Sequence, residues 1–334
     1  MLIPKKIRII RGTSSDLPRG LSTQIMKSAQ DALKYEKSVR ILPKQASEQP
    51  DYILHVGAAT PALLKQYDTR GLAKIIPVPV PSISTCTSPH SLNTGESLHG
   101  YFTLGGDLLS LHHLPARKNQ LNLGANSLMT PPSTEKQKLA GALRAKFSLQ
   151  GPWHAVVAGP NALEVHSYAA PDLTALFSAL GANWYSLLTF EAAGKPVSIL
   201  PQNIGGTIIF APNKRPRLRL EFRRLYLDLD DTLIVHGAIN PHAMRLLKAC
   251  NEQNVDVHLI TRHAGDLPST LKAYGIEEGL FSSIIWIKDK SPKSSHMTPD
   301  GAIFIDDSFQ ERLEVSCTRT SSVFPPEAAS ILMI

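Results

Sequence analysis

Two carboxylates separated by one residue mark the part of the chain where chemistry is easiest to argue. Asp228 and Asp230 directly follow the apolar run 225–227. In an extended segment, residues two apart point to the same side, so both carboxylates should converge on one site at the end of a strand. One of them can attack a phosphorus atom while the other handles a proton. The pair therefore indicates a site for nucleophilic and acid/base chemistry.

Further polar residues follow, and several of them close later apolar runs. They are, in order, a hydroxyl, an amine and more acids with a serine among them: Thr261, Lys293, Asp306, Asp307, Ser308 and Glu311. A phosphate dianion repels an anionic nucleophile, so a cation must lie between them, and hard oxygen ligands favour Mg²⁺. Lys293 would add a second positive charge, and Thr261 would add a neutral hydrogen-bond donor.

This ordered set resembles the four motifs of the haloacid dehalogenase (HAD) superfamily, and the resemblance covers nearly all of residues 225–334. It implies that Asp228 is the nucleophile of an aspartyl-phosphate intermediate and that Asp230 is the general acid/base. It also implies that Thr261 and Lys293 hold the phosphoryl oxygens. The implied Mg²⁺ ligands are Asp228, Asp230, Asp307 and Asp306, with Glu311, Thr232 and Ser308 as additional site residues.

Each of these residues also has an ordinary structural interpretation. Asp230 could form a turn, Thr261 could cap a helix, and Lys293 could be a solvated surface charge. Lys288 and Lys290 are rival lysines for the phosphate-binding role. The ordered set is much more specific than any single residue, and it favours the functional interpretation.

The elements that must position this set are strands and helices in alternation. The pattern over 225–334 predicts a doubly wound parallel sheet, Rossmann-like, and Asn240 has the type and place of a helix N-cap. The intervals between the motifs leave no room for an inserted cap domain, so the predicted site stands open. His236 could touch the substrate and His263 could line the mouth of the site, whereas we expect His258 to be packed within a strand.

A second resemblance, of pattern and order, links the region 95–197 to the C-terminal half of an ATP-grasp domain of the carbamoyl-phosphate-synthase-like kind. The segments that carry it are Gly95-Glu96-Ser97, Gly106-Asp107-Leu108-Leu109, Leu149-Gln150-Gly151-Pro152, Glu164-Val165-His166, Gly181-Ala182-Asn183 and Ala193-Gly194-Lys195-Pro196-Val197.

This second likeness departs from its family at the residues that handle ATP. His166 and Tyr168 stand where the family has the asparagine and arginine of Glu-x-Asn-Pro-Arg, and the upstream lysine and glycine-rich phosphate loop have no counterpart. A triphosphate would lack both charge neutralisation and a cradle. We interpret the region as a reduced relative that serves as a scaffold, a lid or a substrate-recognition module.

Two other functions remain as alternatives to a phosphomonoester hydrolase. One is an ATP-dependent carboxylate–amine ligase with an attached phosphatase. The other is a non-catalytic binding or regulatory protein, although clustered acids without a metal would repel one another strongly. The expected partner is a small phosphorylated substrate, with the end phosphate of a nucleic acid as a further alternative.

The domain organisation follows from shifts in pattern along the 334 residues. Residues 1–75 predict an N-terminal α/β segment, with strands at 7–10 and 52–56 and a helix over 22–35. The segment 76–93, rich in Pro, Ser and Thr, predicts an extended connector within an α+β ATP-grasp-like domain at 76–212. A basic linker or strand follows at 213–224, and the HAD domain occupies 225–334.

Composition sets broad limits on the class of protein. Hydrophobic residues make up 43% and charged residues 19%, which is typical of globular domains. The sequence holds no apolar run of about 18 residues and no secretory signal, so we expect a cytoplasmic protein without a membrane partner. Cys86, Cys250 and Cys317 are expected to be reduced, buried thiols. The net charge of +7 permits an anionic partner but does not require one.

Overall fold

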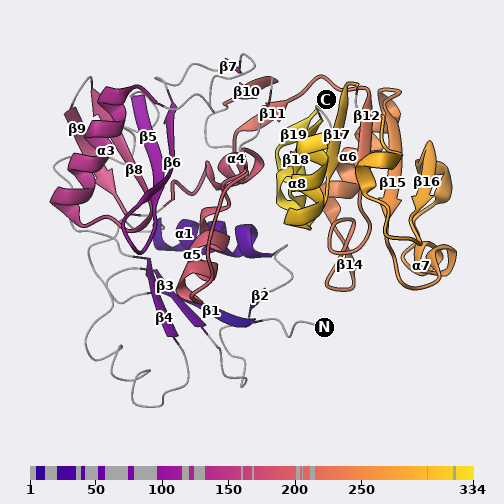
Figure 1. Cartoon of the computed structure of the whole chain (residues 1–334), viewed down its shortest axis with the longest axis horizontal. Helices are drawn as coiled ribbons and strands as arrows, with labels where there is room; N and C mark the ends of the chain where they lie inside the picture. The colour runs from indigo at the N-terminus through magenta and orange to yellow at the C-terminus, as the bar shows by residue number, and fades with distance from the viewer. Residues whose placement is uncertain are drawn as a thin grey trace.

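The structure is a computed structural model of the full chain. It describes residues 5–11, 21–34, 39–41, 52–56, 74–78, 96–114, 120–123, 132–158, 161–167, 169–200, 204, 206–210, 215–298, 300–318 and 321–334. Over these ranges the protein is a mixed α/β structure that contains both parallel and antiparallel sheets (Figure 1).

A parallel sheet of five strands forms the centre of the C-terminal third. The strands are β12 (Arg224–Leu227), β15 (Asp256–Thr261), β16 (Ser283–Trp286), β17 (Ala302–Ile305) and β18 (Ser322–Phe324). Their order is β16-β15-β12-β17-β18, and every neighbouring pair is parallel. The chain therefore moves outward on one side of β12 and then outward on the other, which is the predicted doubly wound order. In such sheets, ligands bind beyond the carboxyl ends of the two strands where the winding reverses, here β12 and β17.

Short helices and one hairpin lie between these strands or, in the case of η4, after the last of them. They are the hairpin strands β13 (Ile234–Val235) and β14 (Ala238–Ile239), the α-helices α6 (Pro241–Glu252), α7 (Leu267–Ala273) and α8 (Phe309–Thr318), and the 3-10 helices η2 (Glu278–Leu280), η3 (Lys293–His296) and η4 (Pro326–Ser330). Asn240 is the N-cap of α6, because its side-chain oxygen accepts from the backbone N–H groups of His242 and Ala243. Only the hairpin and α6 lie between β12 and β15, a stretch that is described throughout, so no cap domain is inserted there.

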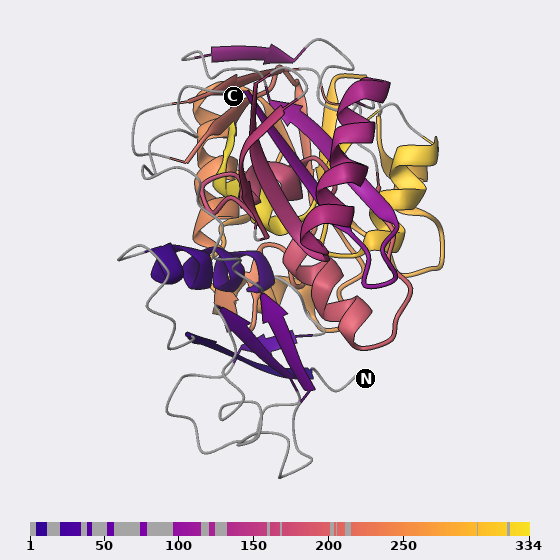
Figure 2. The same ribbon diagram turned by 90° about the vertical axis from the view of Figure 1, so that its left-hand side faces the viewer.

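An antiparallel sheet forms the middle region. Its strands are β5 (Glu96–Phe102), β6 (Leu108–Leu114), β8 (Gly151–Ala158) and β9 (Asn161–His166), in the order β6-β5-β8-β9. Helix α3 (Thr134–Phe147), capped by Ser133, covers one face of this sheet (Figure 2), and its Leu143 belongs to the same hydrophobic cluster as Leu98 and Trp153. Phe177 of α4 (Thr174–Ala179) contacts rings on the other face, and α5 (Trp184–Ala192) follows it.

The N-terminal part contains a parallel sheet and a helix. The strands are β1 (Lys5–Arg11), β2 (Val39–Ile41), β3 (Tyr52–Val56) and β4 (Lys74–Val78), in the order β2-β1-β3-β4, and the helix is α1 (Leu21–Leu33). The buried side chains of Ile25 and Leu33 belong to the same hydrophobic core as those of α4 and α5. The connector expected from residue 76 was wrong at its start, because residues 76–78 continue β4. The remainder of that connector, 79–93, lies outside the described residues.

A mixed sheet joins the end of the chain to the region before the five-stranded sheet. It consists of β7 (Gln120–Leu123), β10 (Gly206–Ile209), β11 (Arg217–Arg219) and β19 (Leu332–Met333), in the order β19-β11-β10-β7. Strand β11 confirms the strand predicted in the basic stretch, with Leu218 buried and Arg219 exposed. Because β19 pairs in parallel with β11, the last residues of the chain lie outside the five-stranded sheet.

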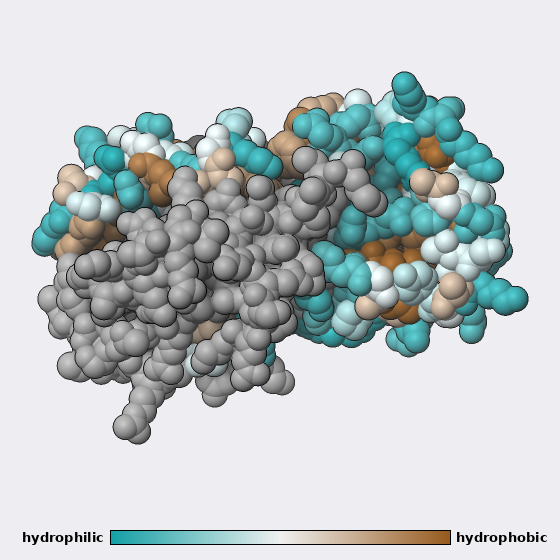
Figure 3. Space-filling model, turned by 90° about the horizontal axis from the view of Figure 1, so that it is seen from below, coloured by the Kyte–Doolittle hydropathy of each residue, from teal (hydrophilic) through white to brown (hydrophobic). Residues whose placement is uncertain are grey.

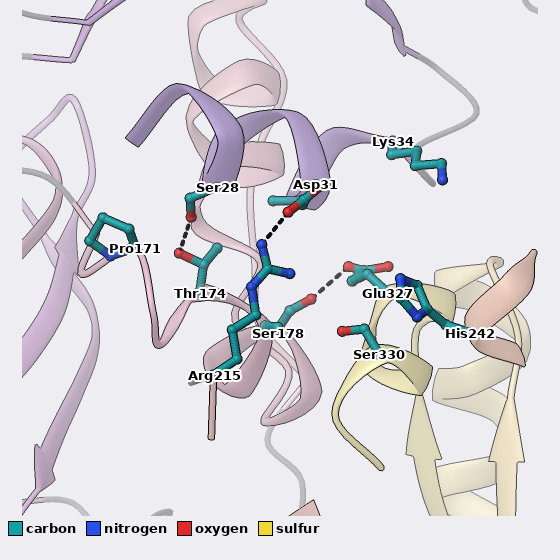
Figure 4. A pocket seen from close by; sticks show the side chains of 12 residues that line it. Ser28, Asp31, Lys34, Pro171, Thr174, Ser178, Arg215, His242, Glu327 and Ser330 are labelled. Carbon is teal, nitrogen blue, oxygen red and sulfur yellow. Dashed lines mark hydrogen bonds and ion pairs between the residues drawn. The ribbon is translucent and has the colours of Figure 1, made fainter. Parts of the chain in front are cut away.

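A polar junction lies where α1, α4, α6 and η4 approach one another (Figure 4). The buried carboxylate of Glu327 accepts hydrogen bonds from Ser178 Oγ at 2.6 Å and from Asn183 Nδ2 at 2.7 Å. Asn183 Nδ2 also donates to the carbonyl of Ala32 at 2.9 Å, and its Oδ1 caps α5. One glutamate therefore holds the C-terminal segment against two helices of the preceding region.

Two smaller expectations can be compared with the structure. Cys250 is buried, and burial raises the pKa of its thiol to about 12. Cys317 is exposed, so the expectation that it is buried was wrong; it lies at the solvent side of the last turn of α8. Cys86 lies outside the described residues. Within the described helices, none is long and apolar enough to cross a membrane.

Candidate active site

Asp228 and Asp306 lie side by side at the carboxyl edge of the five-stranded sheet. Leu227, the last residue of β12, is in register with Ile305, the last residue of β17, so the next residue of each strand begins a loop at the same level. The N–H of Asp228 donates to the carbonyl of Ile305 at 3.0 Å, which extends the ladder by one step. Parallel pairing therefore brings together two acids that lie far apart in the sequence.

Lys293 bridges these two acids. Its Nζ donates to Asp228 Oδ1 at 2.7 Å and to Asp306 Oδ2 at 2.6 Å. The side chains of all three residues are at least nine-tenths buried. Lys288 and Lys290, the rival lysines, are exposed, and Lys288 Nζ lies over the ring of Trp286. Of the three lysines, Lys293 is the one that contacts the acids.

The electrostatics of this cluster follow from burial and close charges. Burial raises the pKa of Asp228 well above its usual range, Asp306 and Asp307 raise it further, and Lys293 partly offsets the rise. Burial alone would lower the pKa of Lys293, but the negative charges of Asp228 and Asp306 outweigh it and raise that pKa above its usual value. Three acids and one amine leave excess negative charge, which a cation can neutralise.

Asp228, Asp306 and Asp307 can hold such a cation together. Each offers a carboxylate oxygen, and these oxygens lie within 4.8 Å of one another. An all-oxygen set suits a hard divalent ion such as Mg²⁺ better than a thiophilic metal. The fourth acid of the expected metal set, Asp230, belongs to a different contact network and does not join this group in the structure.

Asp230 faces His263 at the entrance to the site. His263 Nδ1 lies 3.0 Å from both carboxylate oxygens of Asp230, and His263 Nε2 lies 2.9 Å from Thr270 Oγ1. The hydroxyl of Thr270 donates to the carbonyl of Asp266 at 2.9 Å, so its oxygen is available to accept from the imidazole. The side chain of Asp230 is 52% exposed, so a substrate can reach it.

Thr261 is fully buried at the end of β15. Its Oγ1 accepts from the N–H of His263 at 3.1 Å, which begins the turn after the strand. The neighbouring strand β16 ends level with it, because Thr261 is in register with Trp286. Trp286 Nε1 donates to the carbonyl of His263 at 2.9 Å and fixes the turn from the other side. The hydroxyl of Thr261 therefore lies at the same edge as the acids.

The three additional residues expected at the site, Thr232, Ser308 and Glu311, hold its loops in place. Thr232 Oγ1 accepts from the N–H of Asp307 at 3.0 Å, and the N–H of Ser308 donates to Asp306 Oδ1 at 2.7 Å. Glu311 pairs with Arg262, whose Nε lies 2.9 Å from the carboxylate. Each of them thus fixes a loop of the site.

Sequence reasoning missed Arg312. Its Nη1 donates to the carbonyls of both Asp306 and Asp307, at 2.6 and 2.7 Å. An arginine in the first turn of the helix that follows two loop acids was a usable signal, because a helix start places its side chain back over the preceding loop. Arg312 therefore fixes the loop that carries two of the three candidate metal ligands.

The other flagged histidines have different surroundings. His236 has a positive φ of 50° in the tight turn of the β13–β14 hairpin, and its Nε2 lies 3.0 Å from the carbonyl of Lys34 at the end of α1. His258 stacks on Tyr226, with ring centroids 4.7 Å apart, and Ser283 contacts its Nδ1, as expected for a packed residue.

Seen from below, the part that contains the five-stranded sheet has a largely hydrophilic surface, and apolar atoms appear mainly in recessed places (Figure 3). A comparison of the chain with protein-family models finds no matching family. A search of curated proteins finds no significant match either. The geometry of the site therefore carries the functional argument by itself.

Proposed function

We propose that residues 225–334 are a Mg²⁺-dependent phosphomonoester hydrolase of the HAD type that works through an aspartyl-phosphate intermediate. The observation that carries the proposal is the contact of Lys293 Nζ with both Asp228 and Asp306 at the edge where the winding of the sheet reverses. A buried lysine between two acids, beside a third acid, is a costly arrangement for stability alone. It is well suited to a nucleophile and a metal site that receive a phosphate dianion.

In the first step, an oxygen of Asp228 forms a bond to phosphorus and the bond from phosphorus to the ester oxygen breaks. Asp230, which reaches solvent, donates a proton to the leaving oxygen. In the second step, Asp230 takes a proton from water, the water oxygen attacks phosphorus, and the bond to Asp228 breaks to release inorganic phosphate. The ammonium of Lys293 and the hydroxyl of Thr261 would hold the phosphoryl oxygens.

Asp228, Asp306 and Asp307 would hold the Mg²⁺, because their oxygens already lie within 4.8 Å of one another. When bound, Mg²⁺ neutralises charge and allows an anionic carboxylate to approach a phosphate dianion. Lys293 has already compensated part of the charge of Asp228, so Mg²⁺ and substrate enter a site whose side chains are held in place before binding.

The region before residue 225 is proposed to shape substrate recognition. The site has no inserted cap between β12 and β15, whereas His236, in the hairpin that follows the nucleophile, contacts the end of α1. The N-terminal part therefore lies beside the entrance. We propose a small phosphorylated molecule as the substrate, with the N-terminal part serving in place of a cap.

The test is a panel of phosphomonoesters assayed with Mg²⁺ for the full-length protein and for Asp228→Asn. We expect phosphate release by the wild-type protein, loss of release on chelation of Mg²⁺, and no release above background by the variant. Equal activity of the two proteins would show that Asp228 is not the nucleophile. Matched unfolding curves would establish that the variant is folded.

A further inference from the structure

Lys293 lies in a short segment whose own hydrogen bonds do little to hold it in place. The residue begins the 3-10 helix η3, a single turn in which the N–H of Ser295 donates to the carbonyl of Pro292 at 3.1 Å. A single helical turn forms few hydrogen bonds for the backbone freedom that it loses. The position of Lys293 relative to the acids must therefore be fixed by groups outside η3.

Glu314 of α8 binds the residue that follows Lys293. Its Oε2 accepts from the backbone N–H of Ser294 at 3.3 Å, and its Oε1 accepts a short hydrogen bond from Ser294 Oγ. The N–H of Ser294 belongs to the first turn of η3, where backbone N–H groups have no acceptor within the helix. Ser294 is buried and Glu314 is only partly exposed, so water competes weakly for these hydrogen bonds. Both oxygens of one carboxylate thus bind the residue next to the lysine.

The same side of α8 also holds the loop that leads into η3. Glu311 lies three residues before Glu314, so the two acids are neighbours on the helix surface. Glu311 accepts from Arg262 Nε at 2.9 Å. Arg262 in turn donates to the carbonyls of Asp289 and Ser291, at 3.2 and 2.7 Å. The loop is therefore attached to α8 before η3 through an arginine and within η3 directly.

Helix α8 is attached to the acids of the site as well. Arg312, two residues before Glu314, donates to the carbonyls of Asp306 and Asp307. One helix therefore connects the loop that carries two candidate metal ligands with the segment that carries Lys293. Lys293 Nζ and Asp306 Oδ2 are only 2.6 Å apart, so a displacement of η3 by about 1 Å would disrupt their contact.

We propose that Glu314 is a positioning residue, which holds Lys293 between Asp228 and Asp306 by binding Ser294. Glu314 itself touches neither the substrate nor the reacting atoms. Its effect on catalysis rests on the proposed phosphatase function, because a displaced lysine would no longer meet the phosphoryl oxygens. Its effect on the placement of Lys293 does not depend on that function and can be measured separately.

The deciding experiment measures how fast acetic anhydride acetylates Lys293 in the folded, full-length protein, followed by peptide mass spectrometry. Lys293 is 3% exposed, so its amine reacts only when η3 moves. We expect Glu314→Ala to raise this rate by at least about tenfold, because two hydrogen bonds to a charged group are lost. Glu314→Gln keeps an acceptor oxygen and should largely preserve the protection. The exposed Lys290 should react equally in all variants.

Two controls separate this role from general stabilisation. Gln310→Ala changes an exposed residue of the same helix and should leave the acetylation of Lys293 unchanged. Alkylation of Cys250 by iodoacetamide reports a wider opening of the structure, because Cys250 is fully buried in α6. An unchanged rate at Lys293 in Glu314→Ala, or an equal rise in the rate at Cys250, would overturn the proposal.

Steady-state kinetics provide a second measurement. Glu314→Ala should lower kcat by about tenfold with a smaller change in KM. In the Lys293→Met background it should lower kcat no further, since Glu314 acts through Lys293. Independent losses from the two substitutions would overturn the proposal. An inactive wild-type protein would contradict the proposed phosphatase function, whereas the acetylation rates would still decide the role of Glu314.

Discussion

The carboxyl edge of the five-stranded sheet and the face of the antiparallel sheet gather reactive side chains in different ways. At the edge, Asp228 and Asp306 lie where strands end, and loop groups such as the N–H of Ser308 help to bind the carboxylates. On the face, His99 and His154 lie within strands, where the backbone groups are occupied by the ladder.

This difference shows which chemistry each place can support. A strand end offers backbone N–H groups that the ladder does not use and room for a counter-ion such as Lys293, so neighbouring acids can be accommodated there. The middle of a buried sheet face offers neither, so the residues found there must be able to become neutral, as imidazole can. We expect charge-changing substitutions to have large effects at the edge and smaller effects at the junction between the two regions.

After loss of the nucleophile itself, the largest effect is expected for Asp230→Asn. Loss of the general acid/base should lower kcat by about 10²- to 10⁴-fold with a smaller change in KM. The control is Asp231→Asn, since the neighbouring residue has a positive φ of 56° that asparagine also tolerates. Steady-state kinetics on the best substrate of the panel measures both. Similar losses in the two variants would mean that the turn, rather than the carboxylate of Asp230, is what matters.

Removal of Lys293 should have nearly as large an effect, and on stability as well as activity. Lys293→Met leaves Asp228 and Asp306 buried without their counter-ion, which should cost about 3–5 kcal/mol in the free energy of unfolding in Mg²⁺-free buffer. Urea unfolding measures the loss. Lys290→Met, at an exposed position, should change stability by less than about 0.5 kcal/mol. Equal stability of the two variants would contradict the bridging role of Lys293.

Substitution of Glu327 tests the connection between the two regions, because the contribution of this residue to the free energy of unfolding depends on pH. Burial raises the pKa of Glu327 above its ordinary value, so the folded protein binds this proton more tightly than the unfolded chain does. The stabilising contribution is therefore complete at pH values below the ordinary glutamic acid pKa and is lost as pH rises through the folded-state pKa. Glu327→Gln keeps an acceptor for Ser178 and Asn183 and should remove this part of the pH dependence of the free energy of unfolding.

The comparison for this prediction is Glu252→Gln, an exposed acid at the end of α6. It should leave the pH profile of stability unchanged. Glu327→Ala removes the acceptor and should lower stability by about 1–3 kcal/mol at every pH, because it leaves buried donors without a partner. A wild-type profile in Glu327→Gln would show that the carboxyl group does not titrate at the junction.

The smallest effect is expected for His263→Ala, which frees Asp230 from its partner. A net contribution of about 0.5–1.5 kcal/mol for the lost hydrogen bond corresponds to roughly a two- to tenfold loss of kcat. Thr270→Val removes the second anchor of the same imidazole and should have a smaller effect in the same direction. A loss as large as that of Asp230→Asn would instead give His263 a direct role in the reaction.

Local sequence determined much of the edge site and its sheet. Apolar runs predicted the strands β12, β15 and β17, and Asn240 was identified as a helix cap. The order of the polar residues that follow these runs resembles a phosphohydrolase pattern. These features could be predicted because each depends on neighbours within a few residues along the chain. Parallel strands then bring their carboxyl ends together, so Asp228, Thr261 and Asp306 were expected at one edge.

Only the tertiary structure decided which groups touch. In the structure, Lys293 rather than Lys290 contacts the acids, and Asp230 lies apart from the three clustered acids. Arg312 supports the loop that carries Asp306 and Asp307. The tertiary structure also aligned four histidines, one on each strand of the antiparallel sheet, and inserted the end of the chain beside β11. The physical reason is that strand register, the burial of a long side chain and the pairing of distant strands are set by packing between segments far apart in the chain. Apart from the helix start that could have pointed to Arg312, no local pattern of residues encodes these contacts.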